Sequence, residues 1–360
     1  MAWASSRAGA AGMLALLLAG AIAAEPVAGI AGEAAVGPSA AVRGSLPAAL
    51  CESYRGLPDG FGPGRAGQPN RAGLVHIAGG TFLMGSDQGY REEREVHRVS
   101  VAAFSIDRHE VTNAQFAAFV RATGHVTVAE RRSAAGPAGS AVFVPPKSGA
   151  PADAAYRWWV WVPGADWRHP SGPGSSIAGK DNHPVVHIAY EDARAYADWL
   201  GRSLPTEAQW EYAARGGLDG AAYAWGNVPR PNGREMANTW QGRFPQFNSK
   251  ADGHAGTAPV GCFPANGYGL YDTIGNIWEW TADVYRPGHA PDQAVNPLIA
   301  TREPDAVTGD GNAADMARVI KGGSFLCAPD FCVRYRPASR QPQEATVSTI
   351  HVGFRTVLNR

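Results

Sequence analysis

Apolar and polar residues alternate along this chain mostly in short stretches, and the pattern predicts strands more often than helices. Two apolar stretches, residues 74–77 and 81–84, flank Gly79-Gly80, and this arrangement predicts a β-hairpin. Residues 99–101 and 104–106 predict another short strand. We expect a further strand over residues 183–188.

Two helices are predicted before residue 201. Thr112 can N-cap a helix over residues 113–122, and Gly124 is placed to end it. Residues 191–200 follow a helical period, because four apolar residues fall on one face: Ala193, Tyr196, Ala197 and Leu200.

A third helix is predicted after residue 205. Thr206 and Gln209 have the spacing of a capping box, and Gly216-Gly217 supply a stop signal. Residues 133–155 are rich in Ala, Gly and Pro and predict a loop, and the chain after Gly217 predicts turns and short strands. Short strands with three helices and no internal repeat predict an α+β fold in one domain.

The composition excludes several classes of protein. The 360 residues contain 32 Lys plus Arg and 32 Asp plus Glu, so the net charge is zero. Nucleic acids and anionic membranes attract basic surfaces, and this balance supports neither partner. A hydrophobic fraction of 45% can form a sizeable core, whereas 44 Gly and 27 Pro favour turns over long helices. An all-helical bundle and a disordered chain are therefore excluded.

The N-terminal part of the chain predicts export rather than folded structure. Residues 1–23 predict a signal peptide, because the apolar stretch 13–23 follows Arg7 and ends in small residues. This stretch is shorter than the ~20 residues of a membrane span, although an uncleaved anchor stays open as an alternative. Residues 24–72 predict a flexible linker and residues 73–360 the folded domain. We expect the protein in the periplasm or outside the cell.

Four cysteines supply the candidate chemistry. Cys327 and Cys332 lie five residues apart, just after Gly322-Gly323. Two thiolates at this spacing can close a small disulfide or bind a soft metal ion such as Cu(I). Cys51 and Cys262 are isolated along the chain. Export permits disulfides, but four cysteines allow three pairings, and the sequence does not choose among them.

Seven short motifs, in order along the chain, resemble those of the formylglycine-generating enzyme (sulfatase-modifying factor) family. The resemblance extends over most of the predicted domain, at residues 79–85, 110–113, 204–212, 268–272, 275–280, 321–325 and 353–355. It implies the fold of that family, an α+β domain that is related to C-type lectins and has little regular secondary structure.

The resemblance also implies an activity. Members of the family use O2 to convert a cysteine in a Cys-x-Pro-x-Arg motif of a flexible sulfatase polypeptide to Cα-formylglycine. Cys327 and Cys332 match the cysteines that bind Cu(I), with the substrate thiolate as a third ligand. Ser324 matches the active-site serine, although a turn residue is the simpler interpretation. Trp278 resembles a tryptophan that lines the substrate groove, and a buried aromatic residue is the alternative.

Two structural calcium sites are implied in the same way. Ca2+ takes six to eight oxygen ligands, and alternating side-chain and backbone oxygens in a tight loop can supply them. The first set consists of the side chains of Asp272 and Glu279 and the carbonyls of Gly275 and Ile277. The second consists of the side chains of Asn238 and Asp252 and the carbonyls of Thr239 and His254. Ordinary capping of loops by Asn and Asp is the alternative.

Several positions depart from the family pattern. Some members carry structural disulfides at positions that are here occupied by Ala197, Ala214, Pro337 and Thr356. His351-Val352 and residues 343–348 replace residues that border the substrate groove in the family. The peptide specificity of this chain is therefore open.

Two other functions are also consistent with this fold. A non-catalytic binding module would keep the core motifs and lose the cysteine pair, which this chain retains. A nonheme-iron sulfoxide synthase shares the domain but takes its iron-binding histidines largely from an added helical domain. Here the histidines, His183 and His187 among them, predict core or loop residues, and the extra sequence is a signal and a linker.

Overall fold

The computed structural model describes residues 50–65, 67–132, 136–146, 158–289, 294–299 and 317–359. The predicted signal peptide and residues 24–49 of the predicted linker lie outside these ranges. Within them, no helix has the length and apolar character that crossing a membrane would require.

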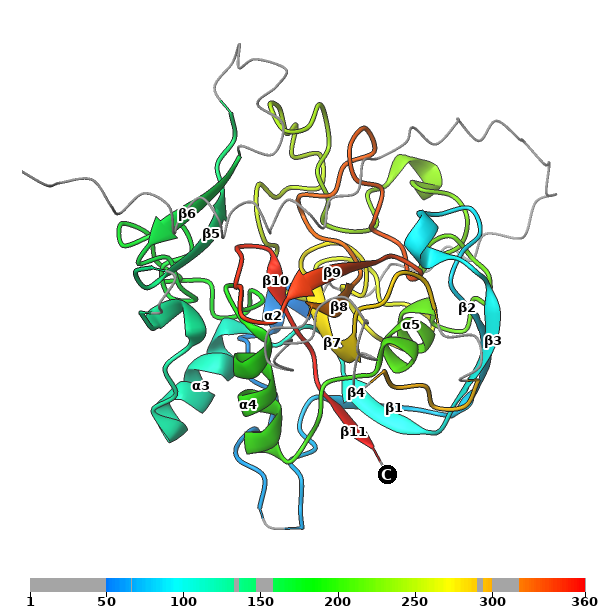
Figure 1. Cartoon of the computed structure of the whole chain (residues 1–360), viewed down its shortest axis with the longest axis horizontal. Helices are drawn as coiled ribbons and strands as arrows, with labels where there is room; N and C mark the ends of the chain where they lie inside the picture. Colours follow the sequence, from blue (N-terminus) through cyan, green and yellow to red (C-terminus); the bar gives the residue numbers. More distant parts are fainter. Residues whose placement is uncertain are drawn as a thin grey trace, which may run out of the picture.

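A four-stranded sheet lies at the centre of the fold (Figure 1). Its strand order is β10-β7-β8-β9, with β7 and β8 antiparallel, β8 and β9 antiparallel, and β10 parallel to β7. Both faces of β7 are covered, because Trp278 and Trp280 and their neighbours are all buried. The strands are β7 (Trp278–Val284), β8 (Ala317–Lys321), β9 (Arg340–Glu344) and β10 (Val352–Gly353).

Three smaller sheets surround the central one. They pair β1-β4-β11, β2-β3 and β5-β6, all antiparallel. Their strands are β1 (Leu74–Ile77), β2 (Gly80–Met84), β3 (His97–Val101), β4 (Phe104–Asp107), β5 (Gly139–Phe143), β6 (Trp159–Pro163) and β11 (Val357–Asn359).

The predicted hairpin is wrong, although both of its strands exist. β1 pairs with β4 and β2 pairs with β3, so Gly79 carries the chain from one sheet to another. A side chain at Gly79 would lie 2.7 Å from the Val101 carbonyl oxygen and the Ala103 nitrogen, and this close approach explains the glycine. The single strand expected around residues 99–106 is likewise two strands in different sheets.

The three predicted helices are confirmed. They are α3 (Asn113–Thr123), α4 (Tyr190–Leu200) and α5 (Glu207–Arg215). The Thr112/Gln115 and Thr206/Gln209 capping boxes begin α3 and α5. Gly124 and Gly216, both in the left-handed conformation, end them. α3 and α4 lie together on one side of the central sheet, and α5 lies on the other (Figure 1).

Two predictions of irregular and regular structure are wrong. The predicted loop over residues 133–155 contains β5, and the predicted strand over residues 183–188 is irregular. His187 has a φ of 60°, which interrupts extended backbone. Its ring is buried and hydrogen bonds to the Ser140 hydroxyl and the Pro170 carbonyl, at 2.7 and 2.8 Å. Burial lowers the pKa of His187 to about 4, so it is the neutral core histidine that we expected.

The packed structure includes part of the predicted linker. Residues 50–53 form the short helix α2 (Leu50–Ser53), and the amide of Gly64 donates to the Trp199 carbonyl at 2.9 Å. Phe61 stacks on Tyr196. A domain boundary at residue 73 is therefore too late. The low hydrophobicity of this segment gave no sign of packing, because only isolated residues such as Phe61 contact the rest of the fold.

Cys51 and Cys262 form a disulfide across a sequence separation of 211 residues. This bond fastens α2 to the body of the fold. Replacing both cysteines by serine should lower the free energy of unfolding by about 2–5 kcal/mol, because the unfolded chain loses a long covalent loop. Denaturant unfolding measures the change. Cys332→Ser, which removes a thiol outside any cross-link, is the matched control, and an unchanged midpoint in the double variant would contradict the assignment.

Candidate functional site

A glycine turn at the end of β8 positions the cysteine pair. Gly322 and Gly323 have φ values of 94° and 78°, which favour glycine. A side chain at Gly322 would also approach the ring of Trp210 to 2.9 Å. The Cys327 amide then donates to the Ser324 carbonyl at 2.9 Å, which closes a tight turn. The turn folds the chain back so that the two cysteines meet.

The two cysteines are free thiols whose sulfur atoms lie 3.3 Å apart. Cys327 is buried, whereas Cys332 is partly exposed. Burial, together with the hydrogen bond to Cys332, raises the pKa of Cys327. The same hydrogen bond and the positive charge of Arg334 lower the pKa of Cys332, although partial burial opposes this shift. The pair therefore favours a thiolate at Cys332 beside a protonated thiol at Cys327.

Ser324 lies in the same turn as the cysteine pair. Its side chain is buried, and its hydroxyl oxygen accepts a hydrogen bond from the Leu326 amide at 3.3 Å. The structure therefore brings together the three predicted catalytic residues. Trp278 is only 2% exposed and packs in the same hydrophobic cluster as Cys327. It is the buried aromatic residue of our alternative and not a wall of an open groove.

Two residues beside the pair were not found from the sequence. The Arg334 guanidinium lies 3.8 Å from the centre of the Tyr90 ring and forms an ion pair with Glu92. The Tyr90 hydroxyl accepts a hydrogen bond from the Val333 amide at 3.1 Å. Arg334 follows Cys332 by two residues, and this spacing could have indicated it. Tyr90 has no such signal, because its contact spans 243 residues.

The residues predicted for one calcium site do lie together. Asp252 accepts hydrogen bonds from the amides of Thr239 and His254, at 3.0 and 2.9 Å. Asn238 donates from its side-chain nitrogen to Gly256 and Asn276. Its side-chain oxygen is buried and has no hydrogen-bond partner within the described chain. A buried oxygen without a donor suits a cation, so these residues fit a calcium ion.

The other predicted calcium set is more complex than the sequence indicated. Both carboxylate oxygens of Glu279 accept hydrogen bonds from Arg355, at 2.6 and 2.7 Å, and Trp210 donates to one of them. Asp272 accepts from the Gly261 amide, and burial raises its pKa to about 7. Glu279 is therefore already held by Arg355, which the prediction did not foresee.

Glu110 is a further acidic residue at this set. Its carboxylate accepts hydrogen bonds from the Asn276 side chain at 2.8 Å and the Ile277 amide at 3.3 Å. Burial and the charges of Asp272 and Glu279 raise its pKa well above the ordinary value. Three buried carboxylates therefore repel one another, and of the three only that of Glu279 hydrogen bonds to Arg355. Glu110 lies in a motif that carried the resemblance, so it was within reach of the sequence.

No three His, Cys, Asp or Glu side chains converge on a possible metal position in the part of the chain that the structure describes. The predicted sites do not require such a cluster. The copper set has two cysteines, and each calcium set as predicted has at most two such side chains.

Comparison with known proteins extends the similarity from the short motifs to most of the chain. A family model described as the sulfatase-modifying factor enzyme 1-like domain matches residues 63–360. The formylglycine-generating enzyme of Mycobacterium tuberculosis is 53% identical over 298 residues, which cover 79% of this chain and 97% of that enzyme. This chain belongs to the sulfatase-modifying factor family. The formylglycine-generating enzyme of Streptomyces coelicolor is 46% identical, with 81% of this chain and 91% of that enzyme covered.

The fold comparison agrees with the family assignment. PvdO from Pseudomonas aeruginosa has a TM-score of 0.55 and 23% sequence identity, with 83% of this chain and all of PvdO covered. This likeness shows the fold alone and confirms the predicted α+β class. A mouse protein named inactive Cα-formylglycine-generating enzyme 2 is 45% identical over 254 residues, which cover 68% of this chain and 78% of that protein. Overall sequence identity therefore does not separate active from inactive members. The residues of the site have to be compared with the requirements of the reaction.

The geometry of the pair predicts unequal reactivity. In copper-free protein at pH 7.5, iodoacetamide should modify Cys332 about tenfold or more faster than Cys327, because Cys332 is partly exposed and favours the thiolate. Mass spectrometry of peptides after timed quenching measures both rates. Cys332→Ser should leave Cys327 slow. Equal rates, or faster modification of Cys327, would show that the pair is arranged differently.

Proposed function

We propose that this protein oxidises a cysteine of a sulfatase polypeptide to Cα-formylglycine, with Cu(I) as cofactor and O2 as co-substrate. The observation that carries the proposal is the pair of free thiols at Cys327 and Cys332, one buried and one partly exposed. The relatives named formylglycine-generating enzymes support the same reaction.

The proposed reaction balances with an external reductant. The substrate side chain loses two hydrogens, one from its thiol and one from Cβ, and becomes a thioaldehyde. O2 takes these two hydrogens with two further electrons and two protons, and two waters form. Water then replaces sulfur in the thioaldehyde, which gives the aldehyde and hydrogen sulfide. The two additional electrons come from a thiol reductant.

The two cysteines fit a soft metal ion. Thiolates are the ligands that Cu(I) prefers, and the pair offers two of them without a competing disulfide. When bound, Cu(I) would supply the redox centre at which O2 and the substrate thiolate react. Cys327 holds its end of the site away from water, whereas Cys332 lies where a substrate can approach.

Ser324 has a positioning role in this proposal. Its hydroxyl oxygen accepts from Leu326, so its own hydrogen remains available for donation toward a group beside Cys327. Arg334 keeps positive charge beside Cys332 and so favours the thiolate that binds metal. Its ion pair with Glu92 and its contact with Tyr90 fix the position of that charge.

Specific observations argue against the two alternative functions, a non-catalytic binding module and a sulfoxide synthase. A non-catalytic binding module would have no need for two free thiols 3.3 Å apart at the end of the Gly322-Gly323 turn. A sulfoxide synthase would need histidines for iron. His187 uses both ring nitrogens in core hydrogen bonds, and His183 hydrogen bonds to the Thr257 hydroxyl at 3.0 Å.

We further propose structural calcium at the two predicted sets and export of the protein. The unpartnered oxygen of Asn238 supports the first site, and the crowded carboxylates of Glu110 and Asp272 support the second. The Cys51–Cys262 disulfide is typical of an exported protein and supports the proposed location. The partner would then be a sulfatase chain that is still flexible.

The oxidation can be tested directly. Protein loaded with Cu(I), O2 and a thiol reductant should convert a Cys-x-Pro-x-Arg peptide to an aldehyde, which a hydroxylamine probe captures for mass spectrometry. Serine at either Cys327 or Cys332 should lower turnover by about a thousandfold or more, since one thiolate cannot replace the pair. Ser324→Ala should slow turnover less.

Metal binding separates two kinds of failure. Tight copper binding without peptide oxidation would mean that the site exists and the substrate differs. A pair that binds no copper would contradict the oxidase proposal and favour the binding module.

Calcium should stabilise the fold in a pH-dependent way. Chelation should lower the melting temperature at pH 8 by roughly 5 °C or more, and Ca2+ should restore it better than Mg2+. The effect should be smaller at pH 5. The raised pKa of Asp272, about 7, means that metal-free protein loses stability as pH rises from about 4 to 7.

Matched variants test the assignment of calcium ligands by calorimetry with and without chelator. Asp252→Asn keeps the hydrogen-bond acceptor and should reduce the Ca2+-dependent shift. Glu235→Gln, at a surface ion pair with Arg230, should leave the shift unchanged. A chelator that changes no melting curve would remove the calcium proposal.

A further inference from the structure

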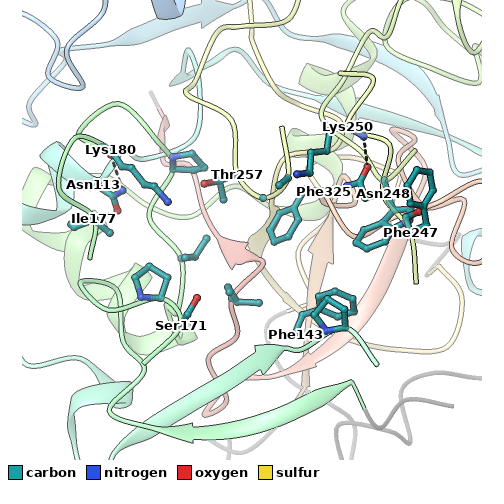
Figure 2. A pocket seen from close by; sticks show the side chains of 18 of the residues that line it. Asn113, Phe143, Ser171, Ile177, Lys180, Phe247, Asn248, Lys250, Thr257 and Phe325 are labelled. Carbon is teal, nitrogen blue, oxygen red and sulfur yellow. Dashed lines mark hydrogen bonds between the residues drawn. The ribbon is translucent and has the colours of Figure 1, made fainter. Parts of the chain in front are cut away.

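A cavity of about 560 Å³ lies beside the cysteine turn (Figure 2). Its volume falls within the range of about 300–1,000 Å³ that is usual for ligand sites. Several aromatic side chains line it, and Phe247 is 60% exposed at its edge. Phe247 therefore leaves an apolar surface open at the edge of the cavity.

The cavity wall is attached to the cysteine pair. Phe325 lines the cavity and precedes Cys327 by two residues. Trp240 also lines it, and its amide donates to the Cys327 carbonyl at 2.9 Å. The cavity wall and the cysteine pair therefore share one turn of the chain, and residues that flank a substrate cysteine are the ones we expect to extend toward the cavity.

The charged side chains that line the cavity are all positive. Lys180 and Lys250 line it, and Figure 2 shows both side chains extending toward the cavity from different walls. None of the described residues that line it is Asp or Glu, and neither lysine forms an ion pair with a described residue. The chain has only four lysines, and Lys321, the third in the described ranges, is buried against Glu207 and Glu211.

Neutral hydrogen-bonding groups complete the lining. They include the side chains of Asn113, Ser171, Gln246, Asn248 and Thr257. Amides and hydroxyls together with two ammonium groups can satisfy a carboxylate, and the aromatic wall can cover an apolar side chain. The cavity therefore matches an acidic residue next to an apolar one.

His351, one of the positions that depart from the family pattern, lies next to the cavity wall. Ile350 lines the cavity, and the next residue is His351. The His351 ring packs 4.7 Å from the ring of Trp159, and the ring hydrogen bonds to the Thr349 hydroxyl at 2.7 Å. His351 is buried, so it shapes the wall from behind. The altered segment therefore adjoins the cavity wall at Ile350, and its Val352 packs in the same buried cluster as Cys327.

We propose that this cavity binds the part of the substrate polypeptide that flanks the target cysteine, and that it selects a segment with an acidic residue beside an apolar one. The inference rests on the proposed oxidation, because it assigns a second contact to the same substrate. Two lysines in a lining that contains no Asp or Glu attract the acidic residue, and Phe247 and Phe325 cover the apolar one.

Peptide binding tests the selection without turnover. Peptides carry Ser in place of the target cysteine of Cys-x-Pro-x-Arg, with Phe-Glu or Phe-Gln placed at successive positions on either flank. Fluorescence anisotropy with the full chain measures the dissociation constants. At the best position, the Glu peptide should bind about fivefold more tightly than the Gln peptide, and 0.5 M salt should remove most of this difference.

Protein variants locate the effect. The double variant Lys180→Gln/Lys250→Gln should bind both peptides equally, whereas Arg71→Gln, at an exposed arginine outside the cavity, should keep the preference. Phe247→Ala should weaken both peptides to a similar degree. Because all four side chains are exposed, melting curves should stay unchanged.

The outcomes separate this inference from the proposed oxidation. Equal affinity of Glu and Gln peptides at every position, in protein that oxidises the Cys-x-Pro-x-Arg peptide, would overturn the selection and leave the oxidation standing. Acetyl-glutamate that binds as tightly as the Glu peptide would also overturn it, because the cavity would then serve a small anion. A preference that requires both lysines supports the selection, even in a preparation that oxidises no peptide.

Discussion

The buried ion pair between Glu279 and Arg355 is the constraint on which the rest of the site depends. Both side chains are 1% exposed or less, and the guanidinium binds both oxygens of the carboxylate. Trp210 donates to the same carboxylate from α5. The pair thus joins β7, the C-terminal segment and α5 at one point. Removing one partner of a buried pair usually costs about 3–5 kcal/mol, because the other charge remains without compensation.

A related contact sets the position of the cysteine turn. Lys321, the last residue of β8, is buried and donates to Glu211 at 2.9 Å and to Glu207 at 3.4 Å, both on α5. Nearby positive charges, including Arg340 for Glu207 and Lys321 for both, lower the pKa of each glutamate to about 2 despite burial. The turn that carries the thiols therefore starts from a strand end that a charge network holds in place.

Local sequence was sufficient for the helices and for the cysteine turn. The Thr206/Gln209 box and Gly216 act within a few residues, and Ser324 and the thiols lie within nine positions of each other. Contacts between residues far apart along the chain could not be predicted from the sequence. The Glu110–Asn276 hydrogen bond spans 166 residues, and strand partners such as β4 and β11 are chosen by packing that no short motif records. Glu279 was recognised as important, but its bond to Arg355 was not.

The two cysteine pairs are completed in a definite order as the chain emerges from its N-terminus. Cys51 appears first and Cys262 second, and they form the disulfide of the folded protein. Cys327 and Cys332 appear last, when the earlier thiols can already have reacted with each other. For a chain exported N-terminus first, as proposed, Cys51 and Cys262 are the first two thiols that can react with each other. This order of arrival favours the native cross-link over pairings with the two later thiols.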